Sequence, residues 1–277
     1  MSEMRALLTD LAMGESARWH DGRFWCSDWV AGEVLAVDVD TGEREVVTRS
    51  TSFPFCFDWT PDGTLLATCA TGLERLEGAS LVPHADLTAI SPLGWNEVMV
   101  DPRGNAFVNN GNFDMSAGFD FEVGSRSGLI AVVTPDGASR QVADTIAFPN
   151  GMAITPDGST LICAESFAQR LSAWDIAPDG GLSNRRVWAE VPGGCDGIAL
   201  DADGALWCAT HTGALRVREG GEVTDVIEVG QFGFSCALGG PDGRTLAIVA
   251  ADWNGPENIG KGPRTGTVYT TQVEVPA

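Results

Sequence analysis

Short apolar stretches alternate with polar turns along the chain, and one turn-and-strand unit recurs six times. A turn that ends in glycine precedes an apolar strand, as in residues 61–63 (Pro-Asp-Gly) before the apolar residues 65–67. The turn glycines stand 39 to 54 residues apart, at Gly22, Gly63, Gly104, Gly158, Gly204 and Gly243. A further apolar strand follows in each repeat, at residues 34–37, 73–76, 129–133, 171–174, 215–217 and 268–273.

Repeats of about 40 to 50 residues that contain only strands are typical of β-propeller blades. We therefore predict one all-β domain over residues 1–277, a six-bladed β-propeller with four-stranded antiparallel blades. A (β/α)₈ barrel would fit the length, but no set of segments between the strands has the helical period of about 3.6 residues. We expect the N-terminal and C-terminal strands to pair in one blade and close the propeller.

The start of the strand that leads into each turn is a second repeated position. It is occupied in turn by Glu15, Phe55, Asn96, Asn150, Asp196 and Ser235. If these strands are the innermost ones, the six positions surround one end of the central channel, and four of them offer carboxylate or carboxamide oxygens. Such oxygens suit a hard divalent cation such as Ca²⁺, Mg²⁺ or Mn²⁺, and suit zinc less well. The alternative is that the Asn-Gly pair at 150–151 and the Asp-Gly pair at 196–197 are hairpin turns, although another turn follows closely in both cases.

Two connections between strands are longer than the others, at residues 111–127 and 252–265. We expect both to emerge beside the ring of polar positions and to act as lids, because long loops in compact domains are usually functional. The alternative is that they are loops without a role. The aromatic and acidic residues of interest in them are Phe113, Phe119, Phe121, Glu122 and Trp253.

Aromatic residues also adjoin the ring positions in the sequence. They are Phe53, Phe55, Trp95, Phe148, Phe232 and Phe234. Singly, each of them fits the apolar core of a propeller. As a group beside a metal, they predict an apolar pocket wall.

Charge and cysteine content narrow the function classes. The chain carries 38 acidic and 17 basic residues, a formal net charge of −21, which disfavours nucleic acid and anionic lipid as partners. Its seven cysteines include no C-x-x-C pair, so we expect reduced thiols. The sequence shows neither a signal-peptide pattern nor a long apolar run, so we expect a cytoplasmic protein with no membrane segment.

Three motifs stand out in combination: Gly14-Glu15 followed by Trp19, residues 148–158 (FPNGMAITPDG) and residues 195–207 (CDGIALDADGALW). They resemble the motifs of the senescence-marker/gluconolactonase/luciferin-regenerating family, and the similarity extends over nearly the whole chain. The resemblance implies a six-bladed propeller that holds one divalent metal ion through Glu15, Asn150 and Asp196. Ca²⁺ is the first choice, with Mn²⁺, Mg²⁺ or Zn²⁺ as alternatives.

The resemblance also implies an enzyme, a metal-dependent lactonase or carboxylic ester hydrolase that acts on a small molecule. The cation would polarise the ester carbonyl, while Asp196 orients or deprotonates water. With the aromatic wall included, the residues expected to contact substrate are Asn96, Glu122, Phe55, Trp95 and Phe148. Gly94 stands where sugar-lactone members of the family often have arginine, so an apolar or aromatic lactone is at least as good a candidate as a sugar lactone.

Two other hypotheses use the same polar ring. In one, the cation is a structural plug in a non-catalytic propeller that binds a small molecule or a protein. In the other, the cation serves an isomerase or another reaction on the same scaffold. The sequence carries no signal for the oligomeric state.

Overall fold

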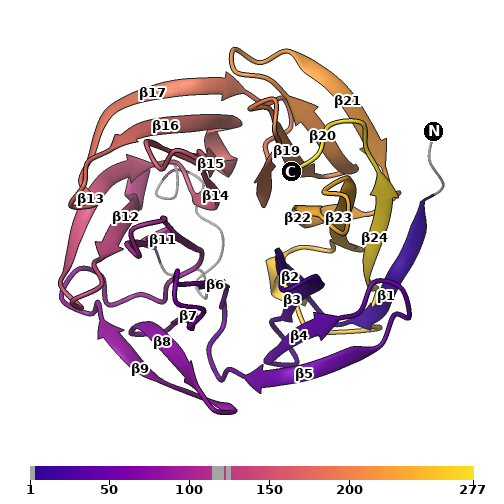
Figure 1. Cartoon of the computed structure of the whole chain (residues 1–277), viewed down its shortest axis with the longest axis horizontal. Helices are drawn as coiled ribbons and strands as arrows, with labels where there is room; N and C mark the ends of the chain where they lie inside the picture. Colours follow the sequence, from indigo (N-terminus) through magenta and orange to yellow (C-terminus); the bar gives the residue numbers. More distant parts are fainter. Residues whose placement is uncertain (1–3, 114–121, 123–125) are drawn as a thin grey trace. The chain divides into compact units, whose positions relative to one another are not determined.

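The computed structural model describes residues 4–113, 122 and 126–277, and nearly all of its regular structure is β-strand (Figure 1). The strands form six four-stranded antiparallel sheets. The protein is therefore a six-bladed β-propeller, which confirms the prediction from the sixfold repeat. Contacts group the residues into two compact units, Met1–Arg49 with Cys195–Ala277 and Ser50–Gly194, and each unit holds three of the sheets.

The first unit contains the sheets β2-β3-β4-β5, β18-β19-β20-β21 and β1-β24-β23-β22. The bounds in the first sheet are β2 Gly14–His20, β3 Arg23–Asp28, β4 Glu33–Val37 and β5 Arg44–Arg49. Those in the second are β18 Ile198–Leu200, β19 Leu206–Thr210, β20 Gly213–Val217 and β21 Val223–Glu228. Those in the third are β1 Arg5–Leu11, β22 Phe232–Gly239, β23 Thr245–Ala251 and β24 Gly266–Gln272, and the 3₁₀ turn η3 spans Pro256–Asn258.

The second unit contains the sheets β6-β7-β8-β9, β10-β11-β12-β13 and β14-β15-β16-β17. The bounds in the first sheet are β6 Phe57–Trp59, β7 Leu65–Cys69, β8 Gly72–Glu77 and β9 Ser80–Asp86. Those in the second are β10 Val98–Val100, β11 Ala106–Asn110, β12 Gly128–Val133 and β13 Ser139–Ile146. Those in the third are β14 Pro149–Ile154, β15 Thr160–Glu165, β16 Arg170–Ile176 and β17 Leu182–Glu190, and the 3₁₀ turn η2 spans Ser166–Ala168.

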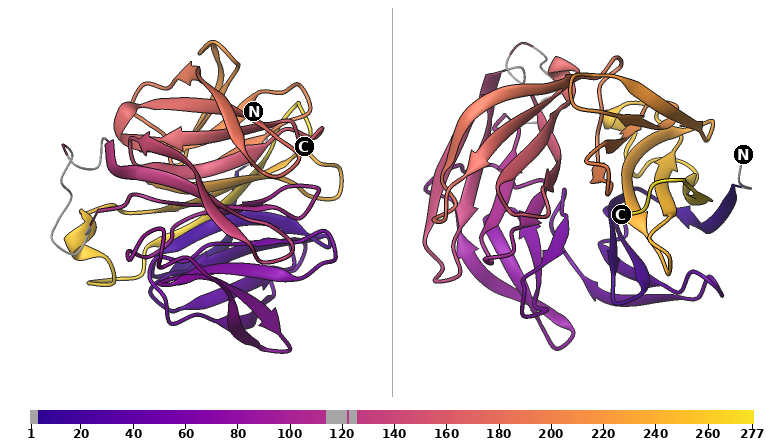
Figure 2. Two further views of the ribbon diagram at one scale, coloured as in Figure 1. Left: turned by 90° about the vertical axis from the view of Figure 1, so that its left-hand side faces the viewer. Right: turned by 45° about the horizontal axis from the view of Figure 1, so that its top comes forward.

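One blade is built from both ends of the chain. Strand β1 (indigo) pairs antiparallel with β24 (yellow), with Arg5 opposite Thr270 (Figures 1 and 2). This pairing confirms the closure expected from the sequence.

The repeated glycine of the sequence lies in the turn between the first and second strands of each blade. In all six turns this glycine has a positive φ, between 67° and 86°, a region that L-residues enter only with strain. The N–H of Gly63 donates to the carbonyl of Thr60, and the N–H of Gly158 donates to the carbonyl of Thr155, each at 2.8 Å. The glycine is therefore a backbone requirement of the hairpin.

Burial differs sharply between the strands of a sheet. Every residue of β7, β11, β19 and β23 is buried, whereas the outer strands β5, β9, β13 and β21 are mainly exposed or half-buried. A strand that is covered on both faces has an uninterrupted apolar sequence. This explains why the sequence reveals the second strands clearly and the outer strands poorly.

All seven cysteines lie in the described residues and are buried, and none of them forms a disulfide. Within the described part of the chain, no helix has the length and apolar character needed to cross a membrane.

Candidate functional site

In the first unit, Glu15 lies on β2 where the strand departs from regular pairing. The register with β3 shifts between Glu15 and Arg18, and Ser16 has a φ of 53°. Irregularities of this kind bend a strand and re-aim a side chain. Glu15 is buried, with 3% of its surface exposed, and its Oε2 accepts a hydrogen bond from the N–H of Ser16 at 2.8 Å. A side chain at Gly14 would not fit, because its Cβ would lie 2.6 Å from Cγ1 of Val249.

Asp196 lies just before β18 in a segment that packs against β22. The N–H of Gly197 donates to the carbonyl of Phe234 at 2.8 Å, and a Cβ on Gly197 would lie 2.7 Å from the Cα of Ser235. The hydroxyl of Ser235 also accepts a hydrogen bond from the N–H of Ala17 at 3.0 Å. Ser235 therefore borders both the irregular part of β2 and the segment that carries Asp196.

Buried thiols also border the Asp196 segment. The Sγ of Cys236 donates to the carbonyl of Gly197 at 3.6 Å. Burial raises the pKa of the Cys236 thiol, and burial together with a hydrogen bond to Cys195 raises the pKa of Cys208. A raised pKa favours the protonated thiol, which is a poor metal ligand, whereas Asp196 offers carboxylate oxygens.

In the second unit, the structure brings Asn96 and Asn150 together. The Nδ2 of Asn96 lies 3.5 Å from the Oδ1 of Asn150, and the Nδ2 of Asn150 donates to the hydroxyl of Ser166 at 3.4 Å. The backbone carbonyl of Asn150 accepts a hydrogen bond from Asn109 at 2.8 Å. Asn150 is 8% exposed, so its carboxamide is fixed in a largely buried position.

The hairpin alternative for the two glycine pairs is wrong. Asn150 and Gly151 lie inside strand β14. The N–H of Asp196 donates to the carbonyl of Ala209 in strand β19 at 3.0 Å, which is cross-strand pairing and not a tight turn. At Gly197 the missing side chain serves close packing.

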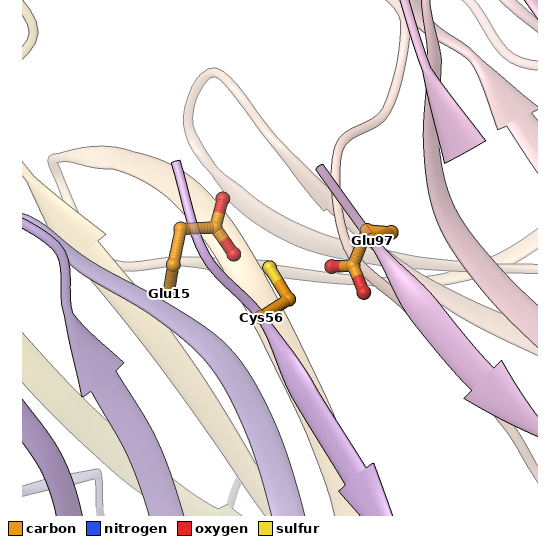
Figure 3. Close-up of side chains that lie close together, drawn as sticks. All are labelled: Glu15, Cys56 and Glu97. Carbon is orange, nitrogen blue, oxygen red and sulfur yellow. The ribbon is translucent and has the colours of Figure 1, made fainter. Parts of the chain in front are cut away.

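Two ligand-type residues of the second unit were missed by the sequence analysis. Cys56 and Glu97 are buried, and their ligand atoms lie within 4.8 Å of one another (Figure 3, which also labels Glu15 of the first unit). Thr68 ties their segments together, because its Oγ1 accepts from the N–H of Cys56 at 2.8 Å and donates to the carbonyl of Asn96 at 2.9 Å. Each of the two residues directly follows a ring position in the sequence, and this adjacency could have identified them as candidate ligands.

An aromatic cluster adjoins Asn150 in the second unit. The rings of Phe148 and Phe167 stack, with centroids 4.5 Å apart and planes at 9°, and Phe113 lies 5.8 Å from Phe148 and 6.4 Å from Phe167. All three side chains are half-buried. Phe148 has a φ of 57°, an uncommon conformation for a bulky residue that tends to occur at functional sites. Partly exposed rings in such a cluster can contact an apolar ligand.

Two other aromatic residues that we expected to contact substrate are core residues. Phe55 and Trp95 both have no exposed surface. Trp95 packs in a hydrophobic cluster with Leu66 and Val98. Their contact with substrate stays a prediction.

The two long connections lie where the sequence places them, between β11 and β12 and between β23 and β24. In the first, Phe119 and Phe121 lie outside the described residues. Glu122 is exposed, and its carboxylate lies 3.8 Å from the guanidinium of Arg126. In the second, Trp253 packs edge to face against Phe234, with ring centroids 5.5 Å apart.

The curated proteins that this chain is similar to include two enzymes. The chain is 27% identical to a pentonolactonase of Haloferax volcanii over 281 aligned residues, which cover 95% of this chain and 89% of the relative. It is 26% identical to the diisopropyl-fluorophosphatase of Loligo vulgaris, covering 88% of this chain and 78% of the relative.

Solved structures share the fold. A luciferin-regenerating enzyme superposes with a TM-score of 0.82 at 18% identity and covers 100% of this chain and 97% of its own. A regucalcin from Agrobacterium tumefaciens superposes with a TM-score of 0.80 at 22% identity and covers 100% and 95%. A family model described as SMP-30/Gluconolactonase/LRE-like region matches residues 13–252. Since this match spans most of the chain and contains all three motifs, the protein belongs to the SMP-30/gluconolactonase/LRE-like family.

Proposed function

We propose that the protein is a hydrolase that opens a lactone or a related carboxylic ester with the help of one divalent cation. The observation that carries this proposal is the family match over residues 13–252. It is strengthened by the relative named a pentonolactonase, which aligns with 95% of the chain. The contact between the half-buried carboxamide of Asn96 and the buried carboxamide of Asn150 supports it further, because two polar side chains held together in a largely enclosed position suit a polar ligand.

The residues proposed to hold the cation are Glu15, Asn150 and Asp196. Their donors are carboxylate and carboxamide oxygens, which Ca²⁺ prefers. The two carboxylates also match the charge of a dication, which offsets the cost of burying them. Ca²⁺ is therefore the first choice, and Mn²⁺, Mg²⁺ and Zn²⁺ are the alternatives.

The proposed reaction adds water across the ester bond. When bound, the divalent cation supplies Lewis-acid polarisation of the ester carbonyl. The carboxylate of Asp196 takes a proton from water as the water oxygen bonds to the carbonyl carbon. The ring C–O bond then breaks, and the leaving oxygen takes up the proton to become the alcohol of the hydroxy acid. The role proposed for Asn96 is to donate a hydrogen bond from its carboxamide to a substrate oxygen.

The substrate proposed for this site has an apolar or aryl part. The half-buried rings of Phe148, Phe167 and Phe113 contact one another, and Phe148 is two residues before Asn150, so the cluster presents apolar surface beside this residue. At Gly94, the glycine in place of the frequent family arginine removes a hydrogen-bond donor for sugar hydroxyls. Both features favour an alkyl or aryl lactone over a polyhydroxylated one.

The test uses the full chain purified without added metal. Elemental analysis comes first, followed by a panel of sugar, alkyl and aryl lactones, carboxylic esters and phosphoesters in a pH-indicator assay, with and without chelator. We expect one divalent ion per chain, proton release from at least one lactone, and loss of activity with chelator that returns on adding Ca²⁺.

Other outcomes separate the alternatives. Turnover of phosphoesters alone would move the assignment to a phosphoesterase. A product with no added water would indicate an isomerase. A chelator that lowers the melting temperature of a protein inactive on the whole panel would leave a metal-plugged binding propeller.

A further inference from the structure

The strand that follows the turn glycine ends on a different residue in each sheet, and in two sheets this residue is a carboxylate behind a proposed ligand, Glu15 or Asn150. These residues are Asp28, Cys69, Asn110, Glu165, Thr210 and Ala251. The carboxylate and carboxamide side chains occur only in sheets whose ring position is Glu15, Asn96 or Asn150. The sheets with Phe55 or Ser235 at the ring position have Cys69 and Ala251 instead, and the sheet of the ligand Asp196 has Thr210.

Asp28 holds the chain just before Glu15. It ends β3, and it is 1% exposed. Its Oδ2 accepts a hydrogen bond from the N–H of Ala12 at 2.9 Å, and its Oδ1 accepts one from the N–H of Met13 at 3.1 Å. The guanidinium of Arg264 donates to Oδ2 at 2.9 Å and balances the buried charge. Ala12 is three residues before Glu15.

Glu165 holds the chain just before Asn150 in the same way. It ends β15 and has no exposed surface. Its Oε2 accepts from the N–H of Ala147 at 2.9 Å, and Ala147 is three residues before Asn150. The guanidinium groups of Arg170 and Arg185 donate to Oε1 at 3.1 and 2.9 Å, and the hydroxyl of Ser172 also donates to Oε1.

Asn110 repeats the arrangement with a neutral side chain. It ends β11 and is 1% exposed. Its Nδ2 donates to the carbonyl of Leu93 at 3.4 Å, and Leu93 is three residues before Asn96. In all three sheets the same strand end is thus tied to the same point of the preceding chain, although the side chains and the backbone atoms differ.

We propose that Asp28 and Glu165 are positioning residues that fix the backbone ahead of Glu15 and Asn150, and so the place of these ligand oxygens, with Asn110 as a weaker counterpart ahead of Asn96. The proposal rests on the proposed function. Neither carboxylate is proposed to touch metal or substrate. Groups that orient metal ligands from behind typically change metal affinity about 10- to 100-fold when they are removed.

If Asp28 and Glu165 only stabilised the fold, removing other buried aspartates should lower the Ca²⁺ affinity as much. Two such aspartates serve as matched controls. Asp201 of the first unit and Asp101 of the second are also buried, and each accepts hydrogen bonds from backbone N–H groups. Asp201 pairs with Arg216 at 2.6 Å, and Asp101 lies 3.6 Å from Arg103. Both lie in the glycine turns at the opposite end of the second strand, away from the ring positions.

The experiment titrates Ca²⁺ alone into the full-length apo chain by calorimetry, for Asp28→Ala against Asp201→Ala and for Glu165→Ala against Asp101→Ala. Melting temperatures are recorded for each variant, and titrations are run where all are folded. We expect about a tenfold or greater rise in the Ca²⁺ dissociation constant for Asp28→Ala and Glu165→Ala, with none for the controls at a similar loss of melting temperature. Asp28→Asn, which keeps an acceptor for Ala12, should recover part of the affinity.

Several results overturn the proposal. If each control loses as much affinity as its partner, or if the wild type and Asp28→Ala bind Ca²⁺ equally, the carboxylates are structural and the proposed function stands. If the wild type binds no divalent cation and opens no lactone, the proposed function fails and the positioning role falls with it. Should an alanine variant not fold, the Asp28→Asn and Asn110→Ala variants carry the same comparison, and unchanged affinity in both overturns the proposal.

Discussion

The two units offer different chemistry at the ring positions. The first unit has carboxylates, at Glu15 and Asp196, whereas the second has carboxamides, at Asn96 and Asn150. A carboxylate brings charge and can accept a proton, while a carboxamide offers an oxygen dipole and a hydrogen-bond donor and does not titrate at ordinary pH. We infer that proton transfer belongs to the first unit and orientation of ligand and substrate to the second.

Single phenylalanines of the two units also differ in burial. In the second unit, Phe148 and Phe167 stack on one another and stay half-buried. In the first unit, Phe234 is 4% exposed and packs in a hydrophobic cluster with Met13 and Ala251. The difference separates rings that are available to a ligand from a ring that holds the fold.

The largest expected effect comes from removing the titratable group. For Asp196→Asn we expect a fall in kcat of about 1000-fold, because both a charge and the proposed base are lost. For Asn150→Ala we expect a fall in kcat/KM of about 100-fold that excess Ca²⁺ partly restores, because only a neutral ligand is lost. Steady-state assays on the best lactone of the panel measure both. Asp40→Asn, an exposed carboxylate of the first unit, is the control and should match the wild type.

Equal losses in the two ring variants would remove the division of labour between the units. So would full rescue of Asp196→Asn by Ca²⁺, since a proposed base is not replaced by more metal.

The aromatic comparison predicts opposite effects of two phenylalanine truncations. Phe234→Ala should destabilise the protein by about 3 to 5 kcal/mol, because it empties a packed core site. Phe167→Ala should cost far less stability and should raise KM for aryl lactones about tenfold, because a stacked ring is worth about 0.5 to 1.5 kcal/mol beyond its buried area. Thermal unfolding and KM values for aryl and small alkyl lactones test the pair. A KM change that is the same for both substrate types would argue against ring contact.

The sequence predicts the fold well because the repeat has a direct physical cause. A turn glycine with positive φ and a strand covered on both faces leave a clear pattern, and the predicted strand at 129–133 is observed as β12 Gly128–Val133. Outer strands such as β9 are half-exposed and carry no such pattern.

The candidate site was only partly predictable. Counting back from the turns finds Asn96 and Asn150, which the structure brings together. It does not distinguish a half-buried ring from a fully buried one, so Trp95 and Phe148 look alike in sequence. The roles of Asp28 and Glu165 depend on contacts between a strand end and a segment 15 to 18 residues away along the chain, and no local pattern reports such contacts.

A smaller effect is expected at Gly94, where the resemblance implies an arginine in sugar-lactone members of the family. Gly94 is exposed, its φ is compatible with other residues, and the nearest atom to an added Cβ would be the Cα of Ala70 at 3.8 Å. Gly94→Arg should therefore fold normally and improve kcat/KM for sugar lactones relative to aryl lactones by about tenfold, through charged hydrogen bonds to hydroxyls. Gly94→Leu is the control for bulk alone. Equal shifts in both variants would show that size, and not the guanidinium, sets the preference.

The smallest effect concerns acid stability and distinguishes Glu165 from an ordinary surface carboxylate. Burial alone raises the pKa of Glu165, but hydrogen bonds from Arg170, Ala147, Ser172 and Arg185 outweigh burial and hold its pKa below the usual value. A carboxyl group whose folded-state pKa is lowered stabilises the protein above its unfolded-state pKa, and this stability is lost as the pH falls through the folded-state pKa. Melting temperature should therefore fall more steeply between about pH 5 and about pH 3 for the wild type than for Glu165→Gln, which has no proton to take up. Parallel curves for the two proteins would mean that Arg170 and Arg185 do not hold the Glu165 carboxylate ionised. Glu165 would then be neutral, as the carboxamides of Asn96 and Asn150 are.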